Sequence, residues 1–600
     1  MRFSVLALDY DGTIAVDGIL DSDVRTAIAE VRAQGITVVL VTGRTLSDLK
    51  RMAGELDFLD AVVAENGAVL GFADGQSRLL GNPPPPSFLS ELRQRGIEFT
   101  AGQCVVEADA AFDQRILAVI RDLELPLVLL FNRGRLMVLP QAISKATGLR
   151  EILTALRLSA HNAIAVGDAE NDHDLLAACE LGVAVSWGSQ ALQKVAEEVL
   201  QGDGPGAVAS YVRQAAKRMR LPPDRIGRRH LTLGSTEDGH PLALAIRGRN
   251  LLVTGDTGSG KSWATGLLCE QLILQGYCVW VIDPEGEYGG LESLAGVVVL
   301  GGEKRPPRLR DLARAVRYPD VSVVVDLSHV PPDQKLDYLN SLLPMLASLR
   351  RSTGLPHRIV IDEAHYFLHE PNVTQLLDLD LGAYILVTYR PSGLHPDLQK
   401  AIEGVIVKRS TDPHEVGALV RMFGTKGVEA EWKTLFQGLA ASQATLLPGI
   451  EEAGGKARRF DMLPRLTSHA RHRRKYFDVP MTTDQGFVFT WKGERVAGPA
   501  LTLRDLVCLL ASSPAQILAG HARRGDFSRW IRNVLRDHRL ASSIRAVERQ
   551  YEFGHIEDLS VALGERIRER YNLPAESDTQ ASPEFGHVAS DSRANKIQSC

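Results

Sequence analysis

Cysteine is scarce in this sequence and never occurs in closely spaced pairs. No C-x-x-C spacing is formed by its six cysteines, which are Cys104, Cys179, Cys269, Cys278, Cys508 and Cys600. Zinc sites and disulfide frameworks depend on such spacings, so both are disfavoured. We expect the thiols to be small buried apolar groups, with Cys600 as a free thiol in the tail.

Long apolar runs and a dominant charge are also lacking. No uninterrupted apolar stretch approaches the roughly 20 residues that cross a bilayer, and Met1-Arg2-Phe3-Ser4 leads into an apolar strand instead of a signal peptide. The net charge of −5 over 600 residues gives no overall basic footprint, so nucleic-acid binding would need a local patch. We expect a soluble, cytoplasmic protein of about three to five domains.

The most informative stretch is a complete phosphate-binding loop of the form G-x-x-x-x-G-K-[ST]. It consists of Gly255, Asp256, Thr257, Gly258, Ser259, Gly260, Lys261 and Ser262. An apolar run, Leu251-Leu252-Val253, precedes the loop and a helix-compatible stretch follows it. In this setting the backbone N–H groups cradle phosphates, Lys261 reaches the β- and γ-phosphates, and Ser262 holds Mg²⁺. The pattern predicts a nucleoside triphosphate site; a Gly-rich turn before a lysine is the alternative.

A second acidic motif follows the loop at a typical distance. The apolar run from Arg358 to Ile361 ends in Asp362 and Glu363. Asp362 suits Mg²⁺ coordination, and Glu363 is placed to polarise the attacking water. After a phosphate loop this pair indicates a Walker B motif, although a simple turn at the end of a strand is the alternative.

Polar residues also follow several apolar strands in the first 215 residues. Asp9 and Asp11 follow the run Val5–Leu8, and Thr42 follows the run Val38–Val41. Asp168, Asn171 and Asp172 follow the run Ala163–Val166, and Lys145 begins a helical segment. The carboxyl ends of parallel strands share one sheet edge, so we expect these groups to meet there. Asp9 and Asp168 offer oxygen ligands for Mg²⁺, and Thr42 and Lys145 suit a phosphoryl group. An Asp-rich turn is the alternative for the first pair.

These four motifs, in this order, resemble the haloacid-dehalogenase-like hydrolases, specifically their Cof and sucrose-phosphatase-like branch. The resemblance implies that Asp9 is a nucleophile that forms an aspartyl-phosphate, and that Asp11 protonates the leaving oxygen and later activates water. It implies that Thr42 and Lys145 bind the phosphoryl group. Asp9, Asp11 and Asp168 then form the Mg²⁺ site, and Asp172, beside Asn171, orients Lys145 or a metal-bound water.

An insertion between Gly67 and Lys145 begins with the stiff run Pro83–Pro86. In the resembled family an insertion here is a cap that selects the substrate. Its pattern places the cap at about residues 82–140. A small cap fits a compact phosphoester, and the family resemblance points to sugar phosphates.

The middle of the chain resembles the HerA/FtsK group of hexameric motor ATPases. The resemblance rests on Asp283-Pro284 after a second strand, on Asp362-Glu363-Ala364-His365, and on the strand Tyr384–Thr388. It implies ATP hydrolysis, a homo-oligomeric ring and action on DNA or on a partner. Two departures are Tyr389, where the group has a sensor glutamine, and a preceding β-barrel reduced to residues 231–246. Arg390 or Arg409 is a candidate arginine finger for a neighbouring subunit; a surface charge is the alternative for each.

The predicted fold class is α/β. We expect two doubly wound parallel-sheet domains, at 1–218 and 225–468, then a mainly helical domain at 476–574 with a short strand at Phe487–Phe489, and a disordered tail at 575–600. The first sheet is expected to end near Gly182–Val185, with helices through 191–200. The basic run Arg471–Lys475 is either a DNA-contacting segment or a solvated linker.

Two functional interpretations remain. The first is a bifunctional enzyme, a Mg²⁺-dependent phosphatase fused to an ATP-hydrolysing, HerA-like motor. The second is a nucleotide-gated regulatory assembly, in which the ATPase is a switch and the phosphatase module is a sensor or scaffold.

Overall fold

The computed structural model describes residues 2–571, except 133, 219–220, 222–227, 248, 370–372, 425–427, 448–455, 468–484 and 536. The expected boundary between the first two domains, at 218–225, lies mostly outside the described residues. The basic run Arg471–Lys475, Cys600 and the expected disordered tail also lie outside them. The described cysteines are free thiols, and all of them except Cys508 are buried. Within the described part of the chain, no helix has the length and apolarity needed to span a bilayer.

The N-terminal part is built on a sheet of eight strands in the order β14-β13-β12-β1-β4-β5-β6-β7. Strand β1 (Val5–Asp9) is central and pairs in parallel with both β4 (Thr37–Val41) and β12 (Ala163–Gly167). Its residues are all buried, as expected for a parallel strand covered on both faces. The other strands are β5 (Ala61–Ala64), β6 (Val69–Phe72), β7 (Ser77–Leu79), β13 (Leu181–Val185) and β14 (Glu198–Leu200).

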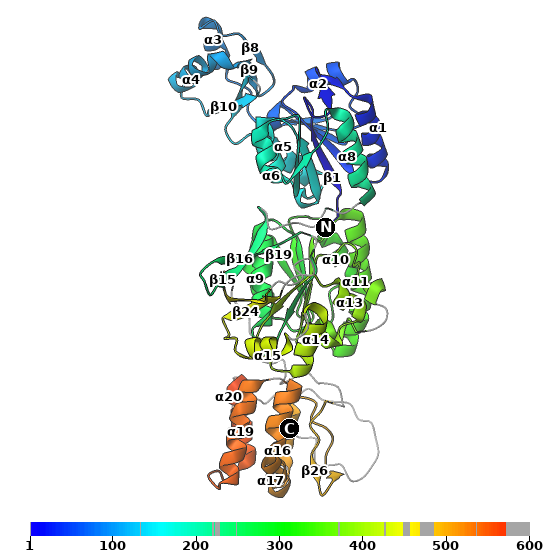
Figure 1. The fold of residues 1–600 in the computed structure, drawn as a ribbon, viewed down its shortest axis with the longest axis vertical. Coiled ribbons are helices and arrows are strands. Elements are labelled where there is room, and N and C mark those ends of the chain that lie inside the picture. Colours follow the sequence, from blue (N-terminus) through cyan, green and yellow to red (C-terminus); the bar gives the residue numbers. More distant parts are fainter. Residues whose placement is uncertain are drawn as a thin grey trace.

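Helices cover both faces of this sheet (Figure 1). One pair is α1 (Ser22–Ala33) with α8 (Pro205–Arg218), and the other is α5 (Lys145–Ala155) with α6 (His173–Ala178). The expectation of helices through 191–200 is wrong for its last residues. Helix α7 (Gln190–Val195) ends early, because residues 198–200 pair in parallel with β13 and extend the sheet as β14.

A smaller layer stands apart from the first sheet at one end of the molecule (Figure 1). It has a four-stranded antiparallel sheet in the order β10-β11-β9-β8. Its elements are α3 (Pro86–Gln94), β8 (Phe99–Ala101), β9 (Val106–Asp109), α4 (Asp113–Asp122), β10 (Leu127–Asn132) and β11 (Arg135–Pro140). Buried side chains such as Phe88, Ile116 and Leu136 give it a core of its own. All these elements fall within the 82–140 range predicted for a cap.

The middle part is built on an eleven-stranded sheet in the order β16-β15-β25-β24-β23-β17-β22-β21-β18-β20-β19. Its parallel strands are β17 (Leu251–Thr254), β18 (Val279–Asp283), β19 (Val297–Gly301), β20 (Ser322–Asp326), β21 (Arg358–Ile361), β22 (Tyr384–Thr388) and β23 (Gly404–Val407). Residues 231–246, expected as the remnant of a barrel, contribute to the hairpin β15 (His230–Thr236) and β16 (Pro241–Ala245) at the sheet edge.

The edge of this sheet and its helices complete the middle part. Strands β24 (Gln443–Leu447) and β25 (Arg458–Met462) join the hairpin to β23 in antiparallel pairing. The main helices are α9 (Lys261–Leu274), α10 (Leu309–Ala315), α11 (Pro332–Thr353), α13 (Pro396–Ala401), α14 (Pro413–Phe423) and α15 (Glu429–Gln437). A short helix, α12, covers Val373–Leu376.

The C-terminal part is mainly helical, with α16 (Leu503–Ser512), α17 (Ala515–Arg524), α18 (Asp526–Trp530), α19 (His538–Glu552) and α20 (Leu559–Tyr571). The strand expected at Phe487–Phe489 does not form. Phe487 makes one bridge, with Ala500, and its ring stacks on Phe527 at a centroid distance of 5.0 Å. Aromatic packing therefore holds this segment in position, and the short strands of this part are β26 (Thr490–Trp491) and β27 (Glu494–Arg495).

The α/β fold class predicted for the chain is confirmed by these sheets and helices.

The first two parts meet through a buried polar junction. Glu180 accepts hydrogen bonds from Tyr277 Oη (2.9 Å) and Arg229 Nη1 (2.7 Å), and its Oε2 lies 2.9 Å from His161 Nδ1. Burial alone would raise the pKa of Glu180, but the hydrogen bond and charge of His161 lower it to about 2. His161 also contacts the carbonyl oxygen of Gln275, at 3.0 Å. His161 precedes β12 and Tyr277 precedes β18, so the junction joins the amino ends of parallel strands and leaves their carboxyl ends on the outer sides.

Candidate active sites

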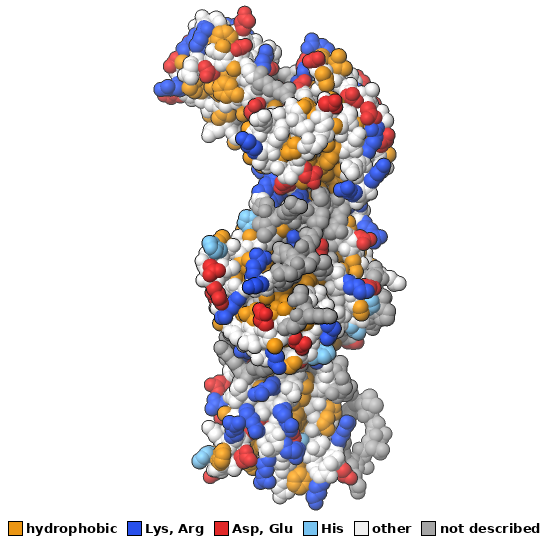
Figure 2. All heavy atoms as spheres, viewed as in Figure 1, with side chains coloured by type: hydrophobic (Ala, Val, Ile, Leu, Met, Phe, Trp, Pro, Cys, Tyr) orange, Lys and Arg blue, Asp and Glu red, His pale blue; other side chains and the backbone are white. Residues whose placement is uncertain are grey.

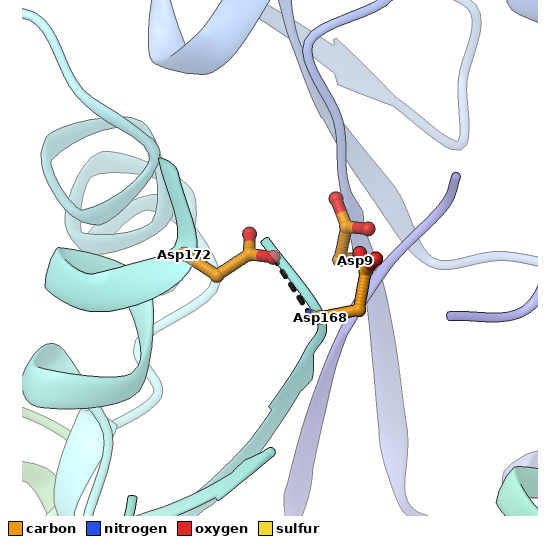
Figure 3. A group of neighbouring side chains, drawn as sticks. All are labelled: Asp9, Asp168 and Asp172. Carbon is orange, nitrogen blue, oxygen red and sulfur yellow. Dashed lines mark hydrogen bonds between the residues drawn. The ribbon is translucent and has the colours of Figure 1, made fainter. Parts of the chain in front are cut away.

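The first site lies at the carboxyl ends of β1 and β12. Parallel register places Leu8 beside Val166, so Asp9 and Asp168, which follow these positions, come together. Lys145, the first residue of α5, extends its Nζ to Oδ1 of Asp9 (2.6 Å) and Oδ1 of Asp172 (2.5 Å). All four side chains are buried. Figure 3 shows how Asp9, Asp168 and Asp172 converge from these elements.

These carboxylates fit a magnesium ion. One oxygen from each of Asp9, Asp168 and Asp172 lies within 4.8 Å of the others. Thr13 Oγ1 bridges two of them, at 3.2 Å from Asp9 Oδ2 and 3.3 Å from Asp168 Oδ1. Three buried carboxylates face one ammonium, which leaves negative charge that a divalent cation would balance. Oxygen donors are also the ligands that Mg²⁺ prefers.

Burial and the neighbouring charges shift the titration of this group. Burial, together with the charge of Asp172, raises the pKa of Asp9 to about 7 against the opposing effect of Lys145. Burial alone would lower the pKa of Lys145, but the carboxylates of Asp172 and Asp9 hold it above its ordinary value. Lys145 is therefore a fixed positive charge beside Asp9 at physiological pH.

Asp172 is held in place by the backbone around it. Its Oδ2 accepts hydrogen bonds from the backbone N–H groups of Asp168 (3.0 Å) and Ala169 (3.1 Å). The neighbouring Asn171 is buried and donates to Oδ1 of Asn66, at 3.2 Å. These contacts fix the turn that carries Asp168 and aim Asp172 at Lys145.

Thr42 and Asp11, both predicted to act at this site, differ in their contacts. Thr42 is buried directly after β4, and its Oγ1 accepts the backbone N–H of Arg44 at 3.1 Å. The carboxylate of Asp11 is bound by Arg44 through Nε and Nη2, both at 2.7 Å, and the cluster of Asp9, Asp168 and Asp172 does not include it. Sequence reasoning assigned no role to Arg44, although its position two residues after Thr42 is a usable signal.

A cavity of about 640 Å³ opens beside this cluster. Asp11, Arg44, Asp168 and Trp187 are among the residues that line it. Trp187 donates its indole N–H to the carbonyl oxygen of Gly12, at 2.7 Å, and so fixes the loop that carries Asp11. Strand β10 of the small antiparallel sheet contacts the turn Glu170–Asp172, which brings that layer next to the site.

The second site contains the phosphate-binding loop between β17 and α9. Gly255 (φ 144°), Gly258 (φ 73°) and Gly260 (φ 97°) adopt positive φ angles that favour glycine. The loop is tied to the end of β23, because the Asp256 N–H donates to the Arg409 carbonyl oxygen (2.8 Å) and the Asp256 carboxylate accepts from Thr411 Oγ1 (2.9 Å). Lys261 Nζ donates to the carbonyl oxygen of Asp256 at 3.2 Å, and Ser262 Oγ donates to Glu287.

The predicted Walker B acids follow β21, which is separated from β17 by one strand, β22. Asp362 and Glu363 follow β21 and are both buried. His365 Nδ1 is 3.5 Å from Glu363 Oε2 and 2.9 Å from Thr388 Oγ1. Tyr389 stands next to His365, and Lys261 Nζ lies 6.0 Å from the centroid of the Tyr389 ring. An aromatic ring therefore faces the loop lysine where the resembled group has glutamine.

The two candidate arginine fingers are both half-buried beside the loop of their own chain. The Arg390 guanidinium lies 5.2 Å from the centroid of the Tyr389 ring. Arg409 contributes its carbonyl oxygen to Asp256. A role for either in a neighbouring subunit stays a prediction.

Comparison with known proteins finds matches to the first two parts of the chain. A model of the haloacid dehalogenase-like hydrolases matches residues 6–82 and 103–212, and a model described as the central domain of helicase HerA matches residues 235–350. Relatives named phosphoglycolate phosphatase come from archaea. That of Methanoculleus marisnigri is 30% identical over 199 residues, which cover 30% of this chain and 82% of the relative. That of Methanopyrus kandleri is 27% identical over 231 residues, 35% of this chain and 96% of the relative.

A third relative, from Methanosarcina acetivorans, is 28% identical over 220 residues, which cover 35% of this chain and 95% of the relative. The hydrolase match encloses Asp9, Thr42, Lys145 and Asp168, while the HerA match encloses the phosphate-binding loop. The chain therefore belongs to the haloacid dehalogenase-like hydrolases and is a phosphatase of that family joined to a HerA-like domain.

Proposed function

We propose that the chain is a bifunctional enzyme. Its N-terminal part hydrolyses a phosphomonoester through an aspartyl-phosphate at Asp9 with Mg²⁺, and its middle part hydrolyses ATP. The observation that carries the first proposal is the buried contact of Lys145 with Asp9 and Asp172 beside Asp168. This set presents a nucleophile, a fixed cation and a metal-binding group at one sheet edge.

The phosphatase reaction follows from these positions. A carboxylate oxygen of Asp9 attacks phosphorus, and the bond between phosphorus and the ester oxygen breaks. Lys145 and the Thr42 hydroxyl stabilise the charge on the transferring phosphoryl oxygens. Asp11 gives a proton to the leaving oxygen and then takes one from the water that attacks the aspartyl-phosphate, which releases phosphate and restores Asp9. Asp9 and Asp168 would hold Mg²⁺, which would neutralise the charge of the carboxylates and of the phosphoryl oxygens, while Asp11 lies outside this cluster.

The substrate class is a small phosphomonoester. The layer of β8–β11 contacts the Glu170–Asp172 turn and is the candidate cap over the cavity. Sugar phosphates are one candidate class, and the names of the relatives add phosphoglycolate. Both are compact enough for a cavity of about 640 Å³.

In the ATPase, the backbone of Gly255–Ser262 and Lys261 bind the phosphates, Ser262 and Asp362 hold Mg²⁺, and Glu363 activates water. Ser262 must leave Glu287 when it takes up the ion. We further propose cytoplasmic homo-oligomeric rings, with six subunits as the candidate number. DNA is the candidate partner. Figure 2 shows Lys and Arg side chains gathered over the C-terminal helices, and the exposed residues Arg504, Arg523 and Arg549 belong to α16, α17 and α19.

The regulatory assembly is the second candidate, and one observation favours it. Tyr389 occupies the position of the sensor glutamine, and its ring faces Lys261. A phenol cannot provide the amide that orients water, so the nucleotide would be bound as a switch and turned over slowly.

Two activities measured on three proteins separate these proposals. Phosphate release from an aryl phosphate and from ATP is measured for the full chain, for Asp9→Asn and for Lys261→Ala. The bifunctional proposal expects each variant to lose one activity and keep the other. ATP turnover no greater in the full chain than in Lys261→Ala, with nucleotide still bound, supports the switch. Aryl phosphate hydrolysis unchanged in Asp9→Asn contradicts the phosphatase mechanism.

A further inference from the structure

A buried lysine lies behind the phosphate-binding loop. Lys408 directly follows β23, and its backbone N–H donates to the carbonyl oxygen of Thr254, the last residue of β17, at 2.8 Å. Its side chain passes along two glycines of the loop. A Cβ atom at Gly255 would lie 2.8 Å from the Lys408 Cβ, and one at Gly260 would lie 3.4 Å from the Lys408 Cε and 3.8 Å from its Nζ. The two glycines therefore let the loop backbone approach the full length of the lysine.

The ammonium of Lys408 is held by uncharged groups. Its Nζ donates to the carbonyl oxygens of Ala441 (2.8 Å) and Gln443 (2.7 Å) and lies 3.4 Å from Met462 Sδ. The residue is buried, and no carboxylate of the described residues forms an ion pair with it. Burial lowers the pKa of Lys408 to about 8, so the side chain is mostly cationic at pH 7.

Stability alone does not account for a lysine at this position. Replacing buried ions by apolar side chains of similar volume is often neutral or stabilising, because the desolvation penalty of the charge disappears. The loop that contacts Lys408 is the predicted site for a triphosphate, which carries several negative charges. Charges interact more strongly in a buried environment than in water. A nucleotide on the loop therefore offers the ammonium the counter-charge that its uncharged partners lack.

We infer that Lys408 is a positioning residue that gives the phosphate-binding loop a second, buried positive charge. The loop backbone and Lys261 contact the phosphates, while Lys408 acts through the loop. Its attraction grows with the number of negative charges on the nucleotide. This inference rests on the proposed ATPase function and names a residue that makes the site prefer a triphosphate over less charged nucleotides. No covalent bond changes in this role.

A purely structural role is the alternative. The two carbonyl oxygens that accept from Lys408 lie at the start of β24 and just before it, so the lysine would only tie this strand to the loop. Losing that tie would loosen the loop and weaken every nucleotide alike. A role for the charge predicts instead a loss of affinity that increases from AMP to ADP to ATP.

The series of three nucleotides tests the inference on the full chain. Dissociation constants are measured at pH 7 with EDTA, so that ATP is not turned over and no metal charge enters. Lys408→Met keeps an unbranched side chain and removes the charge. We expect the dissociation constant to rise at least tenfold for ATP, less for ADP and least for AMP. With Mg²⁺, the KM for ATP should rise by a larger factor than kcat falls.

Arg350→Met is the matched control. It also removes a buried cation with an uncharged partner, since Arg350 Nη2 donates to the carbonyl oxygen of Gly382 at 2.7 Å. Gly382 precedes β22, so this cation lies at the amino end of the strands, away from the loop. The ratio of ATP to ADP affinity should stay unchanged in this variant.

The remaining outcomes separate the inference from the proposed function. An equal change for the three nucleotides in Lys408→Met, or no change, overturns the inference, and so does a graded loss of the same size in Arg350→Met. If Lys408→Met does not fold, Lys408→Gln takes its place with the same expectations, because its amide keeps an N–H donor for the carbonyl oxygens. If the unaltered chain binds none of the three nucleotides, the proposed nucleotide site itself fails.

Discussion

Lys145 Nζ lies 2.6 Å from Asp9 Oδ1, although the two residues are 136 positions apart in the chain. The pair is buried with Asp172, whose Oδ1 also accepts from Lys145. A single buried ammonium therefore compensates two buried carboxylates. This relationship gives the site both its stability and its expected chemistry.

Replacing Lys145 should reduce both the stability of the chain and its phosphatase activity. Lys145→Met leaves Asp9 and Asp172 buried without a counter-charge, and breaking a buried ion pair costs about 3–5 kcal/mol. Urea denaturation of the metal-free chain should show this loss, and phosphate release should disappear. Lys50→Met removes an exposed lysine and is the control. Equal stabilities for the two variants would show that Lys145 does not stabilise this cluster.

The raised pKa of Asp9 predicts a pH dependence of stability. Its pKa is about 7 in the folded chain against an ordinary value of 3.8, so the folded state keeps a proton that the unfolded state has lost between these values. The stability that this proton contributes is fully present below pH 3.8 and is lost as the pH rises through about 7. As the pH rises from 3.8 to about 7, the metal-free unaltered chain should therefore lose unfolding free energy relative to Asp9→Asn. A difference independent of pH contradicts the shift.

Magnesium should stabilise the phosphatase part. Binding to the folded state alone raises the apparent stability with ligand concentration. The melting temperature should rise on addition of Mg²⁺, and phosphate release should stop on addition of a chelator. Asp168→Asn removes one charged ligand and should reduce the rise, whereas Asp174→Asn, in the nearby helix α6, should keep it. A rise of the same size in Asp168→Asn would place the ion elsewhere.

In the ATPase, Glu363→Gln should separate binding from hydrolysis. The amide cannot accept a proton from water, and general base catalysis contributes roughly 10²–10⁴-fold to rates. ATP turnover should fall by about that factor while a fluorescent ATP analogue still binds. Exposed Glu292 gives the control variant Glu292→Gln. Normal turnover in Glu363→Gln would assign the water-activating role to another group.

The junction predicts that the phosphatase and ATPase parts unfold together. Glu180→Ala removes the acceptor shared by His161, Tyr277 and Arg229, and loss of one partner from a buried ionic group costs about 3–5 kcal/mol. In calorimetry, Glu180→Ala should unfold at a lower temperature and in two separate transitions. Glu151→Ala, at an exposed position, should keep the single transition of the unaltered chain. A single unshifted transition in Glu180→Ala contradicts this account of the junction.

The residues at strand ends could be predicted from the local sequence, whereas side-chain contacts between distant parts of the chain could not. Asp9 and Asp168 could be placed together because each follows an apolar strand, and parallel strands end at one edge. The loop Gly255–Ser262 was readable because its glycines, lysine and hydroxyl have fixed spacing. The Arg44–Asp11 pair depends on side-chain direction, which no spacing encodes. The Glu180–Tyr277 contact depends on how the two parts pack, and the β14 strand depends on pairing with β13, which overrides a helical pattern.

The most direct test of the account follows the phosphorus atom. The full chain with Mg²⁺ is quenched with acid during turnover of an aryl phosphate, reduced with borohydride, and digested for peptide mass spectrometry. An aspartyl-phosphate at Asp9 predicts reduction of that side chain to homoserine, during turnover only and never in Asp9→Asn. Homoserine at another aspartate, or turnover with Asp9 unlabelled at every time point, contradicts the proposal that Asp9 is the nucleophile.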